Sequence, residues 1–133
     1  MENPYIINAI ITPDGTQLRS YHLHDYKTHV DEVSGEEYMV DGGSAYLRRN
    51  KNQHPYTEIS KKISDVEDFE KIRELIHWGT YGKDGQSKLT WFSLAEMSNE
   101  HIKAILDSDR KVIWEEQFKQ ELQFRKENNI FSS

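Results

Sequence analysis

Short runs of apolar and β-branched residues, each closed by a turn sequence, fill the first third of the chain. The first run, residues 5–11, ends at residues 12–15, where Pro13 fixes its own φ and Gly15 can adopt a positive one. Apolar and polar side chains then alternate over residues 18–23, which predicts the second strand of a hairpin. Further strands are expected at 27–33, 37–40 and 45–49, with turns at 34–35 and 41–43. The simplest arrangement of these strands is an antiparallel meander.

A helical pattern begins after residues 50–56, a polar stretch without periodicity that is expected to be a loop. Residues 64–67 have the form of a capping box, in which a hydroxyl and a carboxylate each satisfy a free backbone N–H group. The apolar side chains that follow at helical spacing are Val66, Phe69, Ile72, Leu75 and Ile76. Together these signals predict a helix over residues 65–78.

Two more helices and a second hairpin are expected in the last third. Residues 78–81 and 88–92 flank a glycine-bounded turn at 82–85 and predict a short hairpin. Ser98 is placed to cap a short helix, and the last helix is expected over 109–126. The side chains expected to face inward are Ile102, Ile105 and Leu106 in the short helix, and Ile113 or Trp114, Phe118 and Leu122 in the last one.

The order of these elements predicts an α+β fold in a single domain, residues 1–133. An antiparallel N-terminal sheet is expected to be covered by about three C-terminal helices, with a second short hairpin near 78–92. A chain of 133 residues suits one compact unit, since domains most often hold roughly 100 to 150 residues.

Charge and composition exclude several classes of function. Acidic residues outnumber basic ones, and a net charge of -6 opposes passive binding to the phosphate backbone of nucleic acids. The absence of cysteine excludes disulfides, thiolate zinc sites, iron–sulfur clusters and cysteine nucleophiles. No apolar run approaches the roughly 20 residues of a membrane span, and the first residues lack the pattern of a signal peptide. We therefore expect a soluble cytoplasmic protein that binds no membrane.

The densest group of polar residues lies between positions 22 and 31. His22 and His24 would point to the same face of a strand, because side chains alternate along it, and a bend would bring His29 and Asp31 alongside. Two imidazoles and a carboxylate can hold a divalent metal with positions open to water. This arrangement predicts a metal-dependent hydrolase or nuclease as an alternative function. Otherwise the histidines pair with neighbouring carboxylates on a hydrated sheet face.

A second group of residues could bind an anion. Arg48, Arg49 and Lys83 lie near predicted turns and offer cationic groups for a phosphate or a carboxylate. Neighbouring strand residues point to opposite faces, so Arg48 and Arg49 reach one ligand only where the strand has ended or bulged. Otherwise both arginines pair with the acidic excess. The remaining members of a nucleotide site would be the rings of Tyr46, Trp78 and Tyr81, which stack on a base, and the hydrogen-bonding side chains of His22 and His24.

The sequence contains no legible catalytic motif. It lacks a nucleophile elbow, a Ser/His/Asp arrangement and the glycine patterns of phosphate-binding loops. The residues therefore favour a binding protein over an enzyme. An amphipathic helix near a chain end is a common place for self-association, so a homodimer is one expected form.

Four sequence blocks carry a resemblance to a known family. They are His22-Leu-His-Asp-Tyr26, Tyr38-Met-Val-Asp-Gly-Gly43 with Tyr46-Leu-Arg-Arg49, Trp78-Gly-Thr-Tyr-Gly-Lys-Asp-Gly85, and Leu94-Ala-Glu-Met-Ser98 with His101-Ile-Lys-Ala-Ile-Leu106. In order and spacing they resemble a family of small hypothetical proteins encoded by tailed bacteriophages, over residues 5–125. The resemblance implies a context: such phage proteins often act early in infection, by occupying a host enzyme or by neutralising a defence system. Some of them bind a signalling nucleotide and hold it without chemistry.

The residues and the resemblance together lead to one hypothesis with an alternative. The chain is expected to be a non-catalytic phage accessory protein in the host cytoplasm that needs no cofactor. It would counter a host or defence pathway by sequestering an anionic small molecule, in first place a nucleotide signal, or by binding a host protein. The alternative is the metal-dependent hydrolase or nuclease built on His22, His24, His29 and Asp31.

Overall fold

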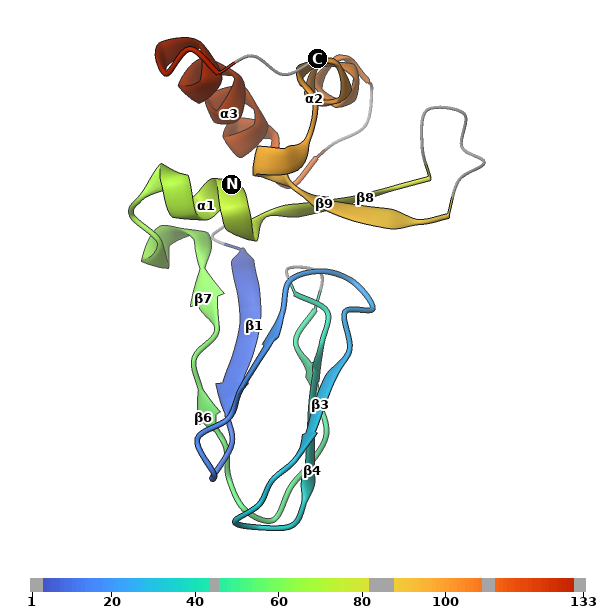
Figure 1. Ribbon diagram of the computed structural model, residues 1–133, viewed down its shortest axis with the longest axis vertical. Helices are drawn as coiled ribbons and strands as arrows, with labels where there is room; N and C mark the ends of the chain where they lie inside the picture. The colour runs from blue at the N-terminus through green and yellow to red at the C-terminus, as the bar shows by residue number, and fades with distance from the viewer. Residues whose placement is uncertain (1–3, 44–45, 82–87, 109–111, 131–133) are drawn as a thin grey trace. The chain divides into compact units, whose positions relative to one another are not determined.

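Strands fill the N-terminal part of the chain and helices most of the C-terminal part, so the predicted α+β class is confirmed (Figure 1). The computed structural model describes residues 4–43, 46–81, 88–108 and 112–130. The chain groups into two compact units that divide after Ile72, within a short helix. Within the described ranges, no helix is both long and apolar enough to cross a membrane. The single domain and the helical cover over the N-terminal sheet stay predictions.

Strands and helices follow one another along the chain, and Figure 1 labels most of them. The first unit contains β1 (Tyr5–Ile11), β2 (Gln17–Ser20), β3 (Lys27–Val30), β4 (Glu37–Asp41), β5 (Arg48–Arg49), β6 (Thr57–Glu58), β7 (Lys61–Lys62) and the 3-10 helix η1 (Ile63–Asp65). Helix α1 (Phe69–Leu75) spans the division between the units. The second unit contains β8 (His77–Thr80), β9 (Thr90–Ser93), the 3-10 helix η2 (Leu94–Glu96), α2 (Asn99–Asp107) and α3 (Glu115–Glu127).

The first unit is built from two antiparallel sheets rather than from one continuous meander. β1 pairs with β2 along one edge and with β6 and β7 along the other, while β3, β4 and β5 form a second sheet in that order. The sequence pattern does not predict β6 and β7, because both are short and polar and both pair with a strand far away in sequence. Pairing over such a distance leaves no local signal.

A small apolar core lies between the two sheets of the first unit. Ile10 from β1, Leu18 from β2, and Tyr38 and Val40 from β4 are buried there, and the ring of Tyr56 packs against them. Because side chains alternate along a strand, the same register that turns these groups inward turns their neighbours outward. The core therefore fixes which side chains of β4 and β5 face the solvent.

β2 and β3 each end before the predicted strands do, and β5 covers only the end of its predicted range. After β2 the chain turns, with the backbone N–H group of Asp25 donating to the carbonyl oxygen of His22 at 3.1 Å. His24 sits in this turn with a φ of 60°. The Asp25 carboxylate stabilises the turn by accepting from the backbone N–H group of Tyr21 at 2.9 Å. The alternation of apolar and polar residues predicts a longer strand because it contains no information about this side-chain hydrogen bond.

The helix predicted over 65–78 is shorter and begins later. Asp68 caps α1, because its carboxylate accepts the backbone N–H group two residues on at 3.0 Å. The predicted capping box at 64–67 does not begin α1; Asp65 instead belongs to η1, where its carboxylate accepts from the backbone N–H group of Lys62 at 2.8 Å. Trp78 lies in β8, where an aromatic residue suits extended backbone. β8 pairs antiparallel with β9, which confirms the two strands of the predicted second hairpin; its predicted turn at 82–85 lies outside the described residues.

α2 begins where the sequence predicts. The hydroxyl oxygen of Ser98 accepts from the backbone N–H group of His101 at 3.1 Å, as an N-cap residue should. Ile102 and Ile105 are buried on the inner face of this helix, as expected, and Leu106 is partly buried. A local cap and a local spacing are thus sufficient to place α2.

α3 begins later than the predicted helix, whose first residues, 109–111, lie outside the described ranges. Trp114 and Phe118 are buried, whereas Ile113 is exposed, so Trp114 starts the apolar line of this helix. The rings of Trp78 and Phe118 meet edge to face with centroids 5.6 Å apart. Such aromatic contacts supply much of the buried area in a chain with few aliphatic residues.

A buried ion network lies along α3. Glu121 accepts hydrogen bonds from Arg125 Nε at 2.5 Å and from Arg73 Nε and Nη2 at 2.8 Å each. Arg125 also donates to the side chain of Asn99 at 2.7 Å and to the carbonyl oxygen of Leu94 at 3.1 Å. Buried charges are tolerated where they are paired and hydrogen-bonded, and this network meets that condition.

Candidate functional site

His22 and His24, which were expected on one strand face, lie instead in the turn after β2. His22 Nδ1 is 3.0 Å from the carbonyl oxygen of Leu23, and His22 Nε2 is 4.0 Å from Asp25 Oδ2. The exposed ring of His24 stacks near the ring of Tyr26, with centroids 6.2 Å apart. The alternation argument therefore does not hold for these two imidazoles.

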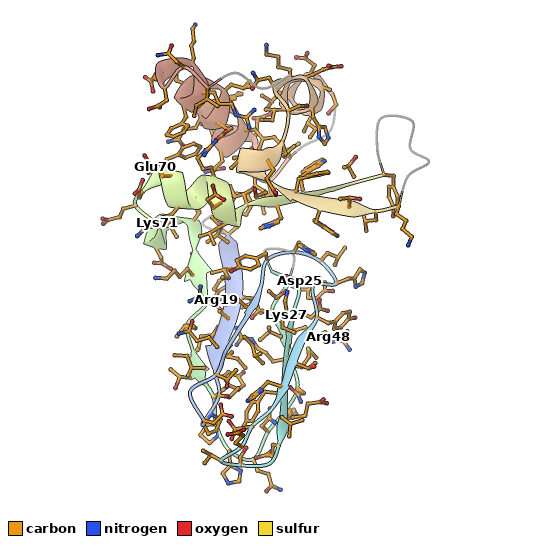
Figure 2. The ribbon with its side chains drawn as sticks, in the orientation of Figure 1. Arg19, Asp25, Lys27, Arg48, Glu70 and Lys71 are labelled. Atoms are coloured by element: carbon orange, nitrogen blue, oxygen red, sulfur yellow. The ribbon has the colours of Figure 1, made fainter. Side chains whose placement is uncertain are left out.

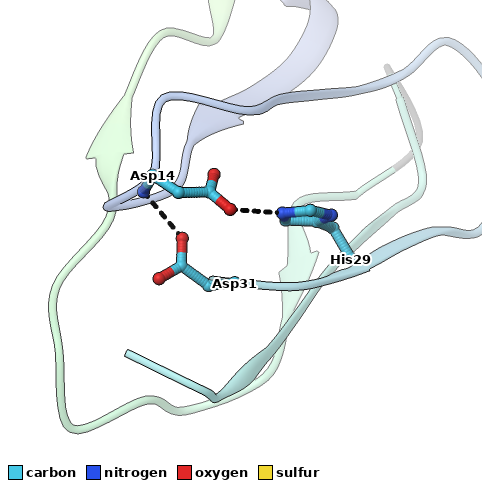
Figure 3. Close-up of side chains that lie close together, drawn as sticks. All are labelled: Asp14, His29 and Asp31. Atoms are coloured by element: carbon cyan, nitrogen blue, oxygen red, sulfur yellow. Dashed lines mark hydrogen bonds and ion pairs between the residues drawn. The ribbon is translucent and has the colours of Figure 1, made fainter. Parts of the chain in front are cut away.

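His29 and Asp31 do meet, and they meet Asp14 rather than the other two histidines (Figure 3). One ligand atom from each of the three residues lies within 4.8 Å of the others. His29 Nε2 is 2.8 Å from Asp14 Oδ2, and the backbone N–H group of Asp14 donates to Asp31 Oδ1 at 2.7 Å. We name Asp14, His29 and Asp31 the turn clamp, because they join the turn after β1 to the turn after β3.

Every carboxylate oxygen of the turn clamp already accepts a hydrogen bond. Asp14 receives the Thr12 hydroxyl group, the imidazole of His29, and the backbone N–H groups of Thr16 and Glu32. Asp31 receives the backbone N–H groups of Asp14 and Ser34. A metal ion would have to compete with these donors for the same lone pairs. Two carboxylates and an imidazole are suitable ligands for a cation, but the hydrogen bonds already explain why the three residues lie together.

These hydrogen bonds hold both carboxyl groups ionised. The backbone N–H group of Glu32, followed by the side chain of His29, keeps the pKa of Asp14 far below its usual range. For Asp31, burial raises the pKa, but the backbone N–H groups of Ser34 and Asp14 outweigh it and leave the pKa lowered. The turn clamp is therefore built on two carboxylates that are ionised at neutral pH.

Arg48 and Tyr46 come together at Asp41. The Tyr46 hydroxyl group donates to Asp41 Oδ2 at 3.0 Å, and Arg48 Nη1 lies 3.8 Å from the same oxygen. Arg48 also donates to the Tyr26 hydroxyl group at 3.3 Å, near the ion pair of Asp25 and Lys27 (Figure 2). Burial and the bond to Asp41 raise the pKa of Tyr46. The Arg48 side chain remains 58% exposed, so this end of β5 is accessible.

Arg49 points the other way and is almost enclosed. β4 and β5 pair Asp41 with Arg48 and Val40 with Arg49, so the two arginines occupy opposite faces of the sheet. Arg49 donates to Asn8 Oδ1 at 2.7 and 2.9 Å and to Ser60 Oγ at 2.7 Å. Two further bonds to the carboxylate of Glu58 come first among the causes that raise the pKa of Arg49. Its charge is therefore neutralised within the protein.

The other expected stacking residues belong to the second unit. Trp78 is partly buried in β8 against Phe118, and Tyr81 is 56% exposed just after that strand. Lys83 lies outside the described residues. The predicted nucleotide site thus draws on residues from both units; in the first unit Tyr46 and Arg48 meet at Asp41, and the backbone of His24 also hydrogen-bonds Tyr46.

A pocket of about 610 Å³ opens on the segment 47–56, where the sequence predicts the end of a strand at 45–49 and a loop at 50–56. Arg49 is the one expected site residue on its wall, and its guanidinium carbon lies 5.4 Å from the ring centroid of Tyr56. The lining residues are Leu47, Arg49, Asn50, Lys51, Asn52, Pro55 and Tyr56. We name this site the 47–56 pocket.

Hydrogen bonds to β4 and its preceding residue hold the pocket segment in place. The Tyr38 hydroxyl group donates to the carbonyl oxygen of His54 at 2.7 Å. The backbone N–H groups of Gln53 and His54 donate to the Glu36 carboxylate at 2.8 and 3.0 Å, and the His54 imidazole bonds the same group. The His54 imidazole is the main cause that lowers the pKa of Glu36. The far wall of the pocket is therefore fixed, although it contains no regular secondary structure.

Two asparagines of the pocket share a single acceptor. The amide nitrogens of Asn50 and Asn52 both donate to the carbonyl oxygen of Glu37, at 2.6 and 2.8 Å. The amide oxygens of both residues are shielded from solvent and have no hydrogen-bond partner. Lys51 lies between them in sequence, is exposed, and makes no ion pair with any residue in the described ranges. The wall thus offers one free cation and two unpaired acceptors.

Comparison of the chain with known proteins does not assign it to a family. The search found no matching family model, no matching curated protein and no matching solved structure. The resemblance to phage proteins therefore stays a prediction, and the candidate site rests on the contacts of its own residues.

Proposed function

We propose that the protein is a non-catalytic binding protein that takes up an anionic, ring-bearing small molecule, a nucleotide, in the 47–56 pocket. The observation that carries this proposal is the wall itself, where the free ammonium group of Lys51 and the ring of Tyr56 line one hollow. Ligand pockets commonly measure roughly 300 to 1,000 Å³ and combine apolar walls with a few placed polar groups. A volume of about 610 Å³ falls within that range.

Each wall residue has a distinct part in this proposal. Lys51 provides the point charge for a phosphate, because an ammonium group on a flexible stem suits a single phosphate oxygen. Tyr56, which is packed against the core, presents a ring that is already fixed before a ligand enters. Arg49 stays bonded to Glu58 and Asn8, and it holds the ring of Tyr56 by a cation–π contact.

The pocket wall favours binding without chemistry. Of the described lining residues, Lys51 and Tyr56 are of types that can act as a nucleophile or a general base, and the same wall holds no carboxylate or imidazole to activate them. Together with the phage resemblance, this supports a protein of the host cytoplasm that sequesters a nucleotide signal and so counters a host or defence pathway.

Isothermal titration of the whole chain against a panel of linear and cyclic nucleotides tests the proposal. Binding should weaken by at least about tenfold in Lys51→Ala, since a charge-assisted contact contributes roughly 1.5 to 3 kcal/mol. Lys61→Ala is the matched control, because it removes the same charge from an exposed position on β7, outside the pocket wall. If the folded wild-type protein gives no heat with any nucleotide, the proposal is wrong, and binding of a host protein becomes the next hypothesis to test.

A further inference from the structure

In the described part of the chain, buried side-chain polar atoms without a partner occur only between residues 41 and 52. Three side-chain atoms within the described residues are shielded from solvent without a hydrogen-bond partner, and all three are oxygens: Asp41 Oδ1, Asn50 Oδ1 and Asn52 Oδ1. Two of them belong to residues on the wall of the 47–56 pocket. Buried polar groups in folded proteins are nearly always paired, so two neighbouring exceptions at one pocket need an explanation.

The missing partner must be a donor. The amide nitrogens of Asn50 and Asn52 each donate one N–H group to the carbonyl oxygen of Glu37, whereas the two amide oxygens accept no hydrogen bond, and an oxygen can be satisfied only by a donor. Each amide oxygen still lacks a hydrogen bond from an N–H or O–H group. A carbonyl or phosphate oxygen of a ligand cannot supply one.

We infer that the 47–56 pocket selects a nucleobase that carries an exocyclic amine, with Asn50 and Asn52 as its specificity-determining residues. This inference rests on the proposed function and names the part of the nucleotide that is recognised. Adenine, guanine and cytosine carry such an amine, whereas hypoxanthine and uracil do not. The amine offers an N–H donor to the amide oxygen of whichever asparagine turns toward the pocket, while the other asparagine stays bonded to Glu37.

The shielded oxygens become reachable by a small change. A donor in the pocket meets them when the amide turns about its terminal side-chain bond, whose torsional wells are broad. The carbonyl oxygen of Glu37 retains one amide donor when the other turns, because both asparagines donate to it. The change therefore exchanges a redundant hydrogen bond for one to the ligand.

Two matched pairs of nucleotides test the inference. AMP is compared with purine riboside 5′-monophosphate, and GMP with IMP; in each pair the second compound lacks the exocyclic amine. Isothermal titration should show the amine-bearing member of at least one pair binding about tenfold more tightly or better, because a site built around a hydrogen bond rejects an analogue that leaves its polar groups unpaired.

Separate variants assign the selectivity to the amides. Asn50→Ala and Asn52→Ala should each reduce the preference within the pair, while the affinity for the compound without the amine changes less than twofold. Gln53→Ala is the matched control, since it removes a neighbouring amide side chain that does not line the pocket. Retained binding of the amine-free compound shows that each variant is folded.

The outcomes separate the two proposals. Equal affinities within both pairs overturn the inference on Asn50 and Asn52 and leave nucleotide binding intact. A preference that survives in both asparagine variants also overturns it, because the amine is then recognised elsewhere. If none of the four nucleotides binds while another member of the wider panel does, the selectivity is wrong but the proposed function stands.

Discussion

The turn clamp and the 47–56 pocket are both groups of polar side chains in the first unit, but their hydrogen bonding differs. In the turn clamp each carboxylate oxygen has a donor, and the backbone supplies most of them. In the pocket two amide oxygens have none. Where every polar atom of a cluster has a hydrogen-bond partner, a structural role is enough to explain the cluster. Where buried polar atoms have no partner, a ligand is the more natural explanation. Residue type alone would favour the turn clamp as the functional site, because imidazole and carboxylate groups such as those of His29 and Asp31 are more typical of catalytic and metal sites than amides are.

The largest loss of stability is expected in the second unit. The Arg73–Glu121–Arg125 network there is, like the turn clamp, a polar cluster held by its own hydrogen bonds. Glu121→Gln should destabilise that unit by about 3 to 5 kcal/mol, because it removes the buried negative charge that pairs with both arginines. Urea unfolding followed by tryptophan fluorescence measures it, since all three tryptophans lie in the second unit. Glu116→Gln, an exposed change on the same helix, should leave the midpoint within experimental error.

Two asparagines of the first unit compare complete and incomplete bonding directly. Asn8 is fully buried, accepts from Arg49 and donates to the carbonyl oxygen of Asp41 at 2.8 Å. Asn8→Ala should therefore cost about 2 to 3 kcal/mol, and Asn52→Ala less than about 1 kcal/mol, because the latter removes an unpaired acceptor together with one redundant donor. Urea unfolding followed by circular dichroism would compare them. Equal costs would contradict the distinction between the two clusters.

Loss of the Asp14 side chain should have a moderate effect. Asp14→Ala removes the acceptor for the two turns that it joins, and we expect a fall in Tm of roughly 5 °C or more. Asp107→Ala serves as the control, because Asp107 is an exposed acidic residue at the end of α2. A fall of similar size in both variants would mean that the turn clamp contributes nothing specific.

Acid should weaken the wild-type turn clamp progressively. The pKa values of Asp14 and Asp31 are lower in the folded state than the value of about 3.9 expected in the unfolded chain. Their contribution is therefore present above that pH and declines as the pH falls through and below it. Thermal melts at several pH values between 7 and 2.5 should show a smaller decline in Asp14→Asn than in the wild type. A parallel decline would exclude Asp14 as a source of the pH dependence.

The smallest effect concerns metal. If hydrogen bonds account for the turn clamp, addition of EDTA, Zn²⁺ or Mn²⁺ should leave Tm unchanged, since a metal ion would only replace donors already present. Differential scanning fluorimetry measures this. A rise in Tm that increases with metal concentration and is absent in Asp14→Asn would make the turn clamp a metal site after all.

Local signals account for what the sequence predicts well. The strand 5–11 is a continuous β-branched run, and α2 follows a serine cap, so both are recognisable within a few residues. The two strands of the second hairpin are confirmed for the same reason. β6 and β7 escape prediction because their partner lies far away in sequence.

The candidate site depends on tertiary contacts that no short window contains. From the sequence Asp14 is an ordinary turn residue, and only the tertiary fold places His29 of β3 beside it. Asn50 and Asn52 read as loop residues, and only their shared acceptor on β4 shows that the segment has a fixed shape. The polar composition of the segment, with Lys51 between two amides, is the one sequence signal that could have singled it out.

The placement of β1 has a consequence for how the chain folds. Its second edge is completed by residues about fifty positions later, as the bond from the Ala9 backbone N–H group to Ser60 Oγ illustrates. During synthesis an apolar strand edge must therefore wait several seconds for its partners, at a translation rate of roughly 5 to 20 residues per second. Over that interval the strand is open to wrong pairing, and a cell producing this protein at high level would be expected to depend on chaperones until residue 62 has emerged.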